Sequence, residues 1–269
     1  MELGNFAIIF PEVIAMELWT QQHARTIPPA LVGMLVLAVI LRLVLKKQPW
    51  EIRMIPMKIL AGIIVLLEIG KQIVSAQGQY DLYSIPLHYC SLFIFMLPAF
   101  AFYRGKGYRT VGGITAGLCA AVLALMLIYP NLIYSAGNIE AYFQDFMSFH
   151  TVTFHNIVML AFILIPALEL HEPQPKGESM AVVWFMVGFC VVSSVMAQIL
   201  KTNYANFYEC NIPVFEEIRL SLQSVLGVVV TQILYIAIVS ALTILFTLAF
   251  YRLYRLLSKV IKKKETVTA

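Results

Sequence analysis

A cysteine and several histidines in apolar surroundings are the residues whose chemistry is most informative in this sequence. Cys90 lies two residues after His88 in the stretch 86–91 (PLHYCS), at the start of a long apolar run. His155 lies in a second stretch, 150–156 (HTVTFHN), which opens another apolar run. Ionisable groups at membrane depth are costly, so they commonly face the interior of a bundle and mark a site. We expect the two stretches to meet near one membrane face and to form a reactive pocket.

A thiol beside an imidazole can carry nucleophilic catalysis. The imidazole accepts the thiol proton, and the thiolate takes an acyl group as a thioester that is then passed on. Two residues are separated by about 200° around a helix, so His88 and Cys90 cannot both point at one spot. The base for Cys90 must therefore come from another segment. The residues alone favour a different interpretation, in which Cys90 is a small apolar packing residue, as free cysteine usually is.

His155 is the candidate general base, with Asn156 or Glu68 as the partner that orients its ring. His150 is five residues away, about 140° around a helix, so the two histidines should have different roles. The residues alone leave open which of them is the base. They also leave open a role in packing, in which His155 hydrogen-bonds another helix.

A zinc site made by His88, His150 and His155 is a further possibility. Their spacing matches no established zinc pattern, and we predict no metal. The other two histidines, His23 and His171, are expected at the membrane interfaces, where His23 would lie on the outer side and could join the site.

Polar residues near the ends of other apolar runs fall at the same depth as the thiol. Glu68 and Lys71 are three residues apart, so they share a helix face and can form an ion pair or orient a histidine. Asn203 and Tyr204 lie in an aromatic-rich loop, which is either an interfacial aromatic belt or a lid over a lipid head group. Such convergence is typical of a water-accessible pocket in the outer leaflet. The opposite halves of the runs are almost purely apolar.

The composition identifies lipid as the solvent for much of the chain. Of its 269 residues, 60% are hydrophobic and 13% are charged, against about 25% charged in a soluble domain. Seven apolar runs are each near the ~20 residues that a helix needs to cross the hydrocarbon. They cover residues 28–45, 56–75, 84–103, 110–129, 150–170, 180–200 and 222–251. Because lipid offers the backbone no partners and the runs are too uniformly apolar for a barrel, we predict an all-α polytopic membrane bundle of seven helices.

The expected organisation is a single transmembrane domain, residues 26–251, between an interfacial N-terminal segment, 1–25, and a basic tail, 252–269. One side of the bundle holds all but four of the 19 lysines and arginines, the exceptions being Arg25, Lys71, Lys201 and Arg219. The positive-inside rule then places the N-terminus outside and the C-terminus in the cytoplasm, in a multi-pass protein of the cell membrane. For the basic tail, anionic lipid head groups are favoured as partners over nucleic acid.

Several short motifs resemble those of a known family. Residues 87–91 (LHYCS) resemble the LHxCS-type motif of the YwaF-like bacterial integral membrane proteins. Residues 154–156 (FHN) resemble that family's histidine-bearing helix, and residues 202–204 (TNY) its segment before the last span. Residues 22–23 (QH), before the first span, also fit. The ordered set extends over most of the chain.

This family is similar to a eukaryotic transmembrane acyltransferase that remodels phospholipids through a cysteine acyl intermediate. The resemblance implies that Cys90 is the nucleophile and that His155 is the base. The assignment of the base is not unique in this sequence, because His150 is a second candidate beside His155.

We therefore predict a membrane-embedded lipid acyltransferase, or lipid-ester hydrolase, that acts on membrane phospholipids near the outer leaflet through Cys90 and His155. No cofactor is expected beyond an acyl donor, either a lipid or acyl-CoA, and no nucleic acid partner. The residues expected to support the pair or bind substrate are His88, His150, Glu68, Lys71, Asn156, Asn203 and Tyr204. The alternative is a non-enzymatic lipid-binding, transport or sensing protein that uses the same pocket. Transport is disfavoured by the lack of Gly/Pro-interrupted spans in matching positions.

Overall fold

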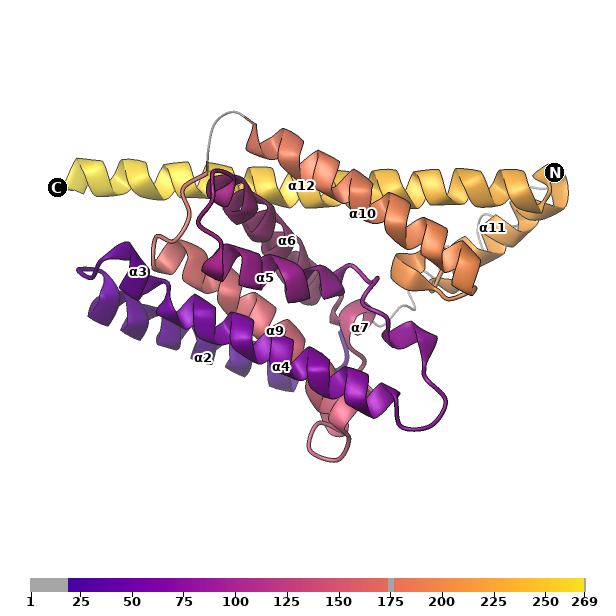
Figure 1. Cartoon of the computed structure of the whole chain (residues 1–269), viewed down its shortest axis with the longest axis horizontal. Coiled ribbons are helices and arrows are strands. Elements are labelled where there is room, and N and C mark those ends of the chain that lie inside the picture. The colour runs from indigo at the N-terminus through magenta and orange to yellow at the C-terminus, as the bar shows by residue number, and fades with distance from the viewer. Residues whose placement is uncertain (1–18, 174–176, 269) are drawn as a thin grey trace.

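Helices make up every regular element in the part of the chain that the structure describes, with no strand there. The computed structural model describes residues 19–173 and 177–268, with side chains as far as Lys259. The long helices run roughly along one axis of the molecule (Figure 1). The predicted class, an all-α helical membrane bundle, is confirmed.

Seven apolar helices follow one another in the order of the predicted runs. They are α2 (Gln21–Leu45), α4 (Ile55–Ser75), α5 (Phe93–Phe102), α6 (Tyr108–Ile128), α9 (Phe146–Ala167), α10 (Glu178–Leu200) and α12 (Val228–Thr268). Short helices connect them: α3 (Trp50–Arg53), α7 (Pro130–Ile133), α8 (Ala136–Glu140) and α11 (Pro213–Leu226), with 3-10 turns η2 (Leu82–Ser84), η3 (Cys90–Leu92) and η4 (Tyr204–Asn206).

Five of these helices are long and apolar enough to cross a membrane: α2, α6, α9, α10 and the part of α12 from Val228 to Lys259. Helix α4 has a suitable length of 21 residues, but it carries three charged side chains, Lys58, Glu68 and Lys71. Helix α5 has only ten residues. Seven crossings and the direction of the bundle remain predictions.

Helix α6 lies at the centre of the packing and contacts α5, α9, α10 and α12. Most of its buried residues are small, and small residues let helix backbones approach closely in lipid. A Cβ atom added at Gly117 would lie 3.1 Å from Cβ of Tyr251 on α12. The glycine therefore sets how closely α12 approaches the bundle. On the other side of α6, α9 packs against both α4 and α2.

The first helix begins seven residues before the predicted run. Thr20 caps it, because its side chain accepts a hydrogen bond from the His23 backbone while the His23 ring accepts one from the Thr20 backbone. The helix then continues through Pro28 and Pro29. Residues 21–25 therefore belong to α2, although the sequence placed them in the N-terminal segment. Residues 1–18 of that segment lie outside the described part.

The third run is not one continuous helix, and the prediction of a helix over 84–103 was wrong. Proline disfavours the helical conformation of the residue before it, and Ile85 before Pro86 is extended (φ −60°, ψ 134°). Residues 85–89 form no helix, and the chain turns helical only at η3, which leads into α5. The helical angle between His88 and Cys90 therefore does not apply.

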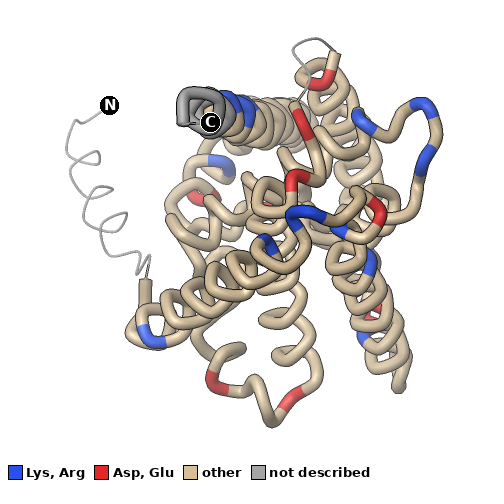
Figure 2. The backbone as a smooth tube through the Cα atoms, turned by 90° about the vertical axis from the view of Figure 1, so that its left-hand side faces the viewer, with Lys and Arg blue, Asp and Glu red and all other residues tan. Residues whose placement is uncertain are grey.

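The last run is divided by a glycine. Gly227 has a positive φ of 80° and ends α11, and α12 then runs without interruption from Val228 to Thr268. The predicted tail, 252–269, therefore continues the last helix through Thr268. Figure 2 looks onto the end of the molecule that contains the C-terminus, and Lys and Arg lie at helix ends and loops there.

The contact at Gly117 generates a prediction about stability. We expect Gly117→Leu to destabilise the bundle by about 1–3 kcal/mol, the usual cost of overpacking, because its side chain would meet Tyr251. Gly62 is the matched control, since a Cβ there has nothing within 4 Å and Gly62→Leu gains helix propensity. Thermal unfolding in detergent measures both variants. Equal melting temperatures for the two would contradict this account of α6.

Candidate active site

The thiol of Cys90 and the imidazole of His155 are in direct contact. Cys90 Sγ and His155 Nε2 lie 3.1 Å apart. His155 is the tenth residue of α9, about 14 Å from the start of that helix, which is deeper than the sequence suggested. Cys90 is the first residue of η3, just before α5. Helix α5 packs on α4, and α4 packs on α9, so the pairing depends on all three helices.

A backbone carbonyl fixes the tautomer of His155. Its Nδ1 lies 2.7 Å from the carbonyl oxygen of Thr151, one helical turn earlier. A carbonyl oxygen can only accept, so Nδ1 carries the hydrogen and Nε2 has a free lone pair. Nε2 therefore accepts from the Cys90 thiol. This is the orientation that a general base for Cys90 requires.

Aromatic rings enclose the imidazole. The rings of Phe154 and Tyr134 lie 5.8 and 5.9 Å from it, centroid to centroid. His155 is only 7% exposed, whereas Cys90 is half-buried. His23, which was expected at the interface, is fully buried within the protein, and its Nε2 donates to the Tyr134 carbonyl over 3.2 Å. His23, at the start of α2, thus holds the backbone of Tyr134, and the Tyr134 ring contacts the His155 ring.

A buried polar cluster lies between α4, which supplies Glu68, Lys71 and Gln72, and His150 on α9, about one and a half turns before His155. Glu68 is 3.5 Å from Lys71 Nζ and accepts from the Gln72 side chain over 2.6 Å. His150 Nε2 is 3.7 Å from the second Glu68 oxygen and makes no hydrogen bond within the described structure. Of the two histidines, His155 contacts the thiol and His150 faces Glu68. The orienting partner of His155 is the Thr151 carbonyl rather than Glu68.

His88 lies in a different set of contacts from Cys90. Its Nε2 donates to the Tyr83 carbonyl over 3.1 Å, and its Nδ1 accepts from the Ala205 backbone over 3.5 Å. Its ring packs between those of Tyr83 and Tyr204. His88 therefore ties the irregular segment before Cys90 to the loop after α10.

Asn203 and Tyr204 hold the same loop in place. The Tyr204 hydroxyl donates to the Leu82 carbonyl over 2.5 Å. Asn203 donates to Asn211 over 2.9 Å and accepts from two backbone N–H groups of its own loop. Asn156 follows His155 on α9 and is half-buried, and its side chain forms no hydrogen bond with a described residue. Tyr204 thus connects this loop to η2, and none of the three side chains hydrogen-bonds the thiol or the imidazole.

The three histidines of the possible zinc site, His88, His150 and His155, have three different partners, namely the Tyr83 carbonyl, Glu68 and Cys90. Over residues 19–173 and 177–268, no group of three or more His, Cys, Asp or Glu side chains lies close enough to hold a metal ion.

A second polar cluster lies at the opposite end of the bundle, where the sequence predicted almost purely apolar helices. His171 Nε2 and Glu178 Oε1 are 3.2 Å apart, with side chains 2% and 3% exposed. Tyr251 donates to Glu178 over 2.6 Å, and the Tyr254 hydroxyl lies 3.3 Å from His171 Nδ1. His171 was expected at a membrane interface, and its side chain is buried within the protein.

Paired glycines make room for this second cluster. A Cβ at Gly112 would lie 2.6 Å from the His171 ring, and one at Gly113 would lie 2.9 Å from the Glu178 carboxyl group. Two adjacent glycines in an apolar run, with an acidic residue at the head of another run, were the sequence signal available. The partner of each glycine could not be read from that signal.

The Glu68 cluster yields a prediction. Glu68→Gln removes the carboxylate that faces Lys71, and both side chains are about nine-tenths buried. Losing one partner of a buried ion pair costs roughly 3–5 kcal/mol, so we expect a large fall in melting temperature in detergent. Glu140 is exposed, and Glu140→Gln serves as the control, with an expected change within about 0.5 kcal/mol. A Glu68→Gln variant as stable as this control would show that the carboxylate is not needed as a counter-charge.

Comparison with known proteins gives one match. The model of the TMEM164 family matches residues 18–254, which include both members of the thiol–imidazole pair and both polar clusters. No curated protein and no solved structure matches the chain.

Proposed function

We propose that this chain, which belongs to the TMEM164 family, is a membrane-embedded lipid acyltransferase or lipid-ester hydrolase with Cys90 as nucleophile and His155 as general base. One observation carries the proposal: the 3.1 Å contact between Cys90 Sγ and His155 Nε2, with the tautomer fixed from the far side of the ring by Thr151. The membrane nature of the chain makes a membrane lipid the natural substrate. The resemblance of the LHYCS and FHN motifs to the YwaF-like proteins supports the same assignment.

The resting pair is a neutral thiol hydrogen-bonded to a neutral imidazole. Burial away from water penalises a thiolate and an imidazolium, and both groups lie among apolar and aromatic side chains. The proton therefore moves only as the sulfur attacks, which is general-base catalysis rather than attack by a preformed thiolate.

The first half-reaction would form a thioester. His155 Nε2 accepts the thiol proton while Cys90 Sγ bonds to the carbonyl carbon of a lipid ester. Collapse of the tetrahedral intermediate breaks the bond to the alcohol oxygen, and that oxygen takes the proton back from His155. The products are acyl-Cys90 and a lysolipid, and the pair of residues carries no net charge at the end.

The second half-reaction determines whether the protein transfers or hydrolyses. A hydroxyl group of an acceptor lipid, or water, gives its proton to His155 and attacks the thioester carbonyl. The departing sulfur recovers the proton and regenerates the resting pair. A site closed to water favours transfer, because hydrolysis of a reactive intermediate needs a water molecule beside it.

Trapping the thioester tests the proposal. Purified protein in liposomes with an alkyne-tagged phospholipid should acquire a hydroxylamine-sensitive tag, which in-gel fluorescence detects. We expect Cys90→Ser to abolish the hydroxylamine-sensitive tag and His155→Ala to slow its formation by about 10²–10⁴-fold, the usual contribution of a general base. Cys210 is also half-buried, so Cys210→Ser is the matched control and should label normally.

Unchanged labelling of both Cys90→Ser and His155→Ala would overturn the mechanism. A non-enzymatic lipid-binding role makes a different prediction, in which Cys90→Ala keeps function and a bulky side chain at this position blocks it.

The two histidines of α9 can be separated in the same assay. His150 Nε2 faces Glu68 and does not contact the thiol, so we expect His150→Gln to form the thioester at a rate within about tenfold of the wild type. His155→Gln lacks a base for the thiol and should lose at least about 10²-fold. The reverse order of the two variants would assign the base to His150.

A further inference from the structure

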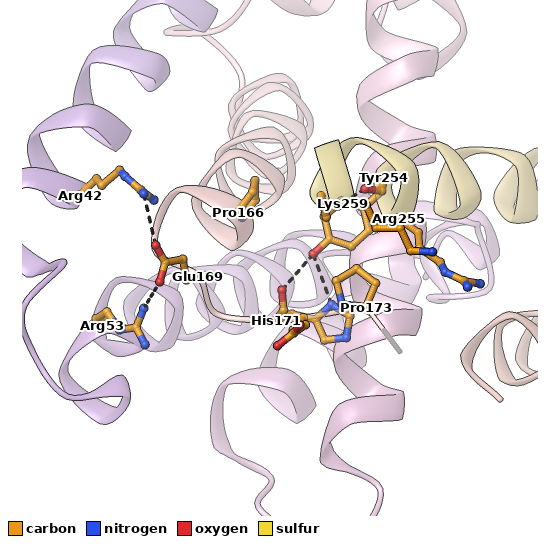
Figure 3. A pocket seen from close by; sticks show the side chains of 11 residues that line it. Arg42, Arg53, Pro166, Glu169, His171, Pro173, Tyr254, Arg255 and Lys259 are labelled. Atoms are coloured by element: carbon orange, nitrogen blue, oxygen red, sulfur yellow. Dashed lines mark hydrogen bonds and ion pairs between the residues drawn. The ribbon is translucent and has the colours of Figure 1, made fainter. Parts of the chain in front are cut away.

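A basic pocket lies at the end of the bundle opposite the start of α9, between the ends of α2, α9 and α12. Its volume is about 370 Å³. Four basic side chains and two acidic ones line it: Arg42, Arg53, Arg255, Lys259, Glu169 and Glu172. Figure 3 shows Arg42 and Arg53 directed at Glu169 on one side, with the α12 residues on the other.

The two sides of the pocket differ in how their charges are compensated. Glu169 forms ion pairs of 3.2 and 3.3 Å with Arg42 and Arg53, which also donate to carbonyls at the end of α9. Arg255 and Lys259 form no ion pair with any described acidic residue. With four basic and two acidic side chains, the pocket has an excess of positive charge, and two of the basic side chains lie on α12. A phosphate group is the natural complement of such an arrangement.

An apolar groove adjoins the basic pocket. It has a volume of about 440 Å³ and lies between α2, α6 and α9. It shares Arg42 and Pro166 with the basic pocket, and its other lining side chains are apolar, among them Leu31, Val39 and Phe162. Eleven residues of α2 separate Arg42 from Leu31, about 16 Å along the helix. A charged pocket therefore opens into a groove suited to an acyl chain.

We propose that these two hollows form one binding site for an anionic phospholipid. Its phosphate would lie by Arg255 and Lys259, and one acyl chain would lie in the groove along α2. The lipid would come from the leaflet at this end, which the positive-inside rule makes cytoplasmic. A soluble phosphate compound shares the head-group chemistry but would leave the groove without a role.

This site is separate from the thiol–imidazole pair. Pro166 and His155 are eleven residues apart on α9, about 16 Å along its axis. The ester bonds of a lipid held by its phosphate at Arg255 and Lys259 would lie near that end of the groove, far from Cys90. The proposal therefore concerns a lipid that is bound and not the one that reacts, and it does not depend on the proposed enzymatic activity.

Native mass spectrometry of the full chain in mild detergent, titrated with phosphatidylglycerol or phosphatidylcholine, tests the proposal. We expect a preference for phosphatidylglycerol that the double variant Arg255→Gln/Lys259→Gln weakens by about 30-fold, at about 1 kcal/mol for each basic residue. Lys46→Gln/Lys47→Gln is the matched control. It removes the same charge from exposed positions that do not line the pocket, and it should keep the preference.

A second pair of variants tests the groove. Val39 is 58% exposed and lines the groove, so Val39→Trp should fill it and weaken phosphatidylglycerol binding. Leu43 is 70% exposed on the same helix and does not line the groove, so Leu43→Trp should not. Glycerophosphoglycerol, the same head group without chains, should compete poorly.

Equal losses in the two charge variants would overturn the proposal in favour of general surface attraction. Effective competition by glycerophosphoglycerol, together with no effect of Val39→Trp, would also overturn it and identify a site for a soluble phosphate compound. Each variant must retain the wild-type melting temperature and elution volume, and Arg255→Lys/Lys259→Arg, which keeps both charges, should keep the preference.

Discussion

Lipid offers no hydrogen-bond partner to a polar group, so a polar side chain within this bundle is costly unless it finds a partner in the protein. The thiol of Cys90 is satisfied by His155, and His155 is satisfied on its other side by a carbonyl of its own helix. Glu68 is satisfied by Lys71 and Gln72 on the next turn of α4. The arrangement of the candidate site follows from this requirement as much as from chemistry, because each pair also joins two helices or stiffens one.

The same requirement explains how an irregular stretch of backbone can exist beside the site. Non-helical backbone at membrane depth is tolerated only where protein or a water-filled cavity surrounds it. Here side chains from the surrounding elements donate to carbonyls of this stretch and of η2 before it: Ser193 donates to Leu87, Tyr204 to Leu82 and Gln72 to Ser84. Because these bonds come from α10, η4 and α4, three elements hold the segment that ends at Cys90. The thiol is thereby placed by a fixed loop rather than by the face of a helix.

Helix α9 connects the two ends of the molecule. Its first half bears His150 and His155, and its last residues accept from Arg42 and Arg53 beside the basic pocket. Since α9 packs on α2, α4 and α6, it is held along its length. Occupancy of the basic pocket and chemistry at the thiol would therefore act on opposite ends of one rigid element.

The sequence by itself determined the solvent and the class of fold, because hydropathy is a property of local composition and needs no knowledge of neighbours. It also singled out Cys90 and His155, since an ionisable residue in an apolar run is costly wherever the run is packed. It placed the ends of α2 and α12 poorly, because capping by Thr20 and the turn at Gly227 depend on local backbone geometry that an average over an apolar run conceals.

Tertiary structure alone decided which polar residues meet. His150 and His155 are the same residue type and lie five positions apart on one helix. Only the packing of α4 against α9 places His150 beside Glu68 and leaves His155 beside the thiol. The buried contact of His171 with Glu178 likewise depends on the space left by Gly112 and Gly113, which have no side chains to occupy it. A partner is chosen by the approach of one helix to another, and that approach is set by the shapes of all the side chains between them rather than by any single run of residues.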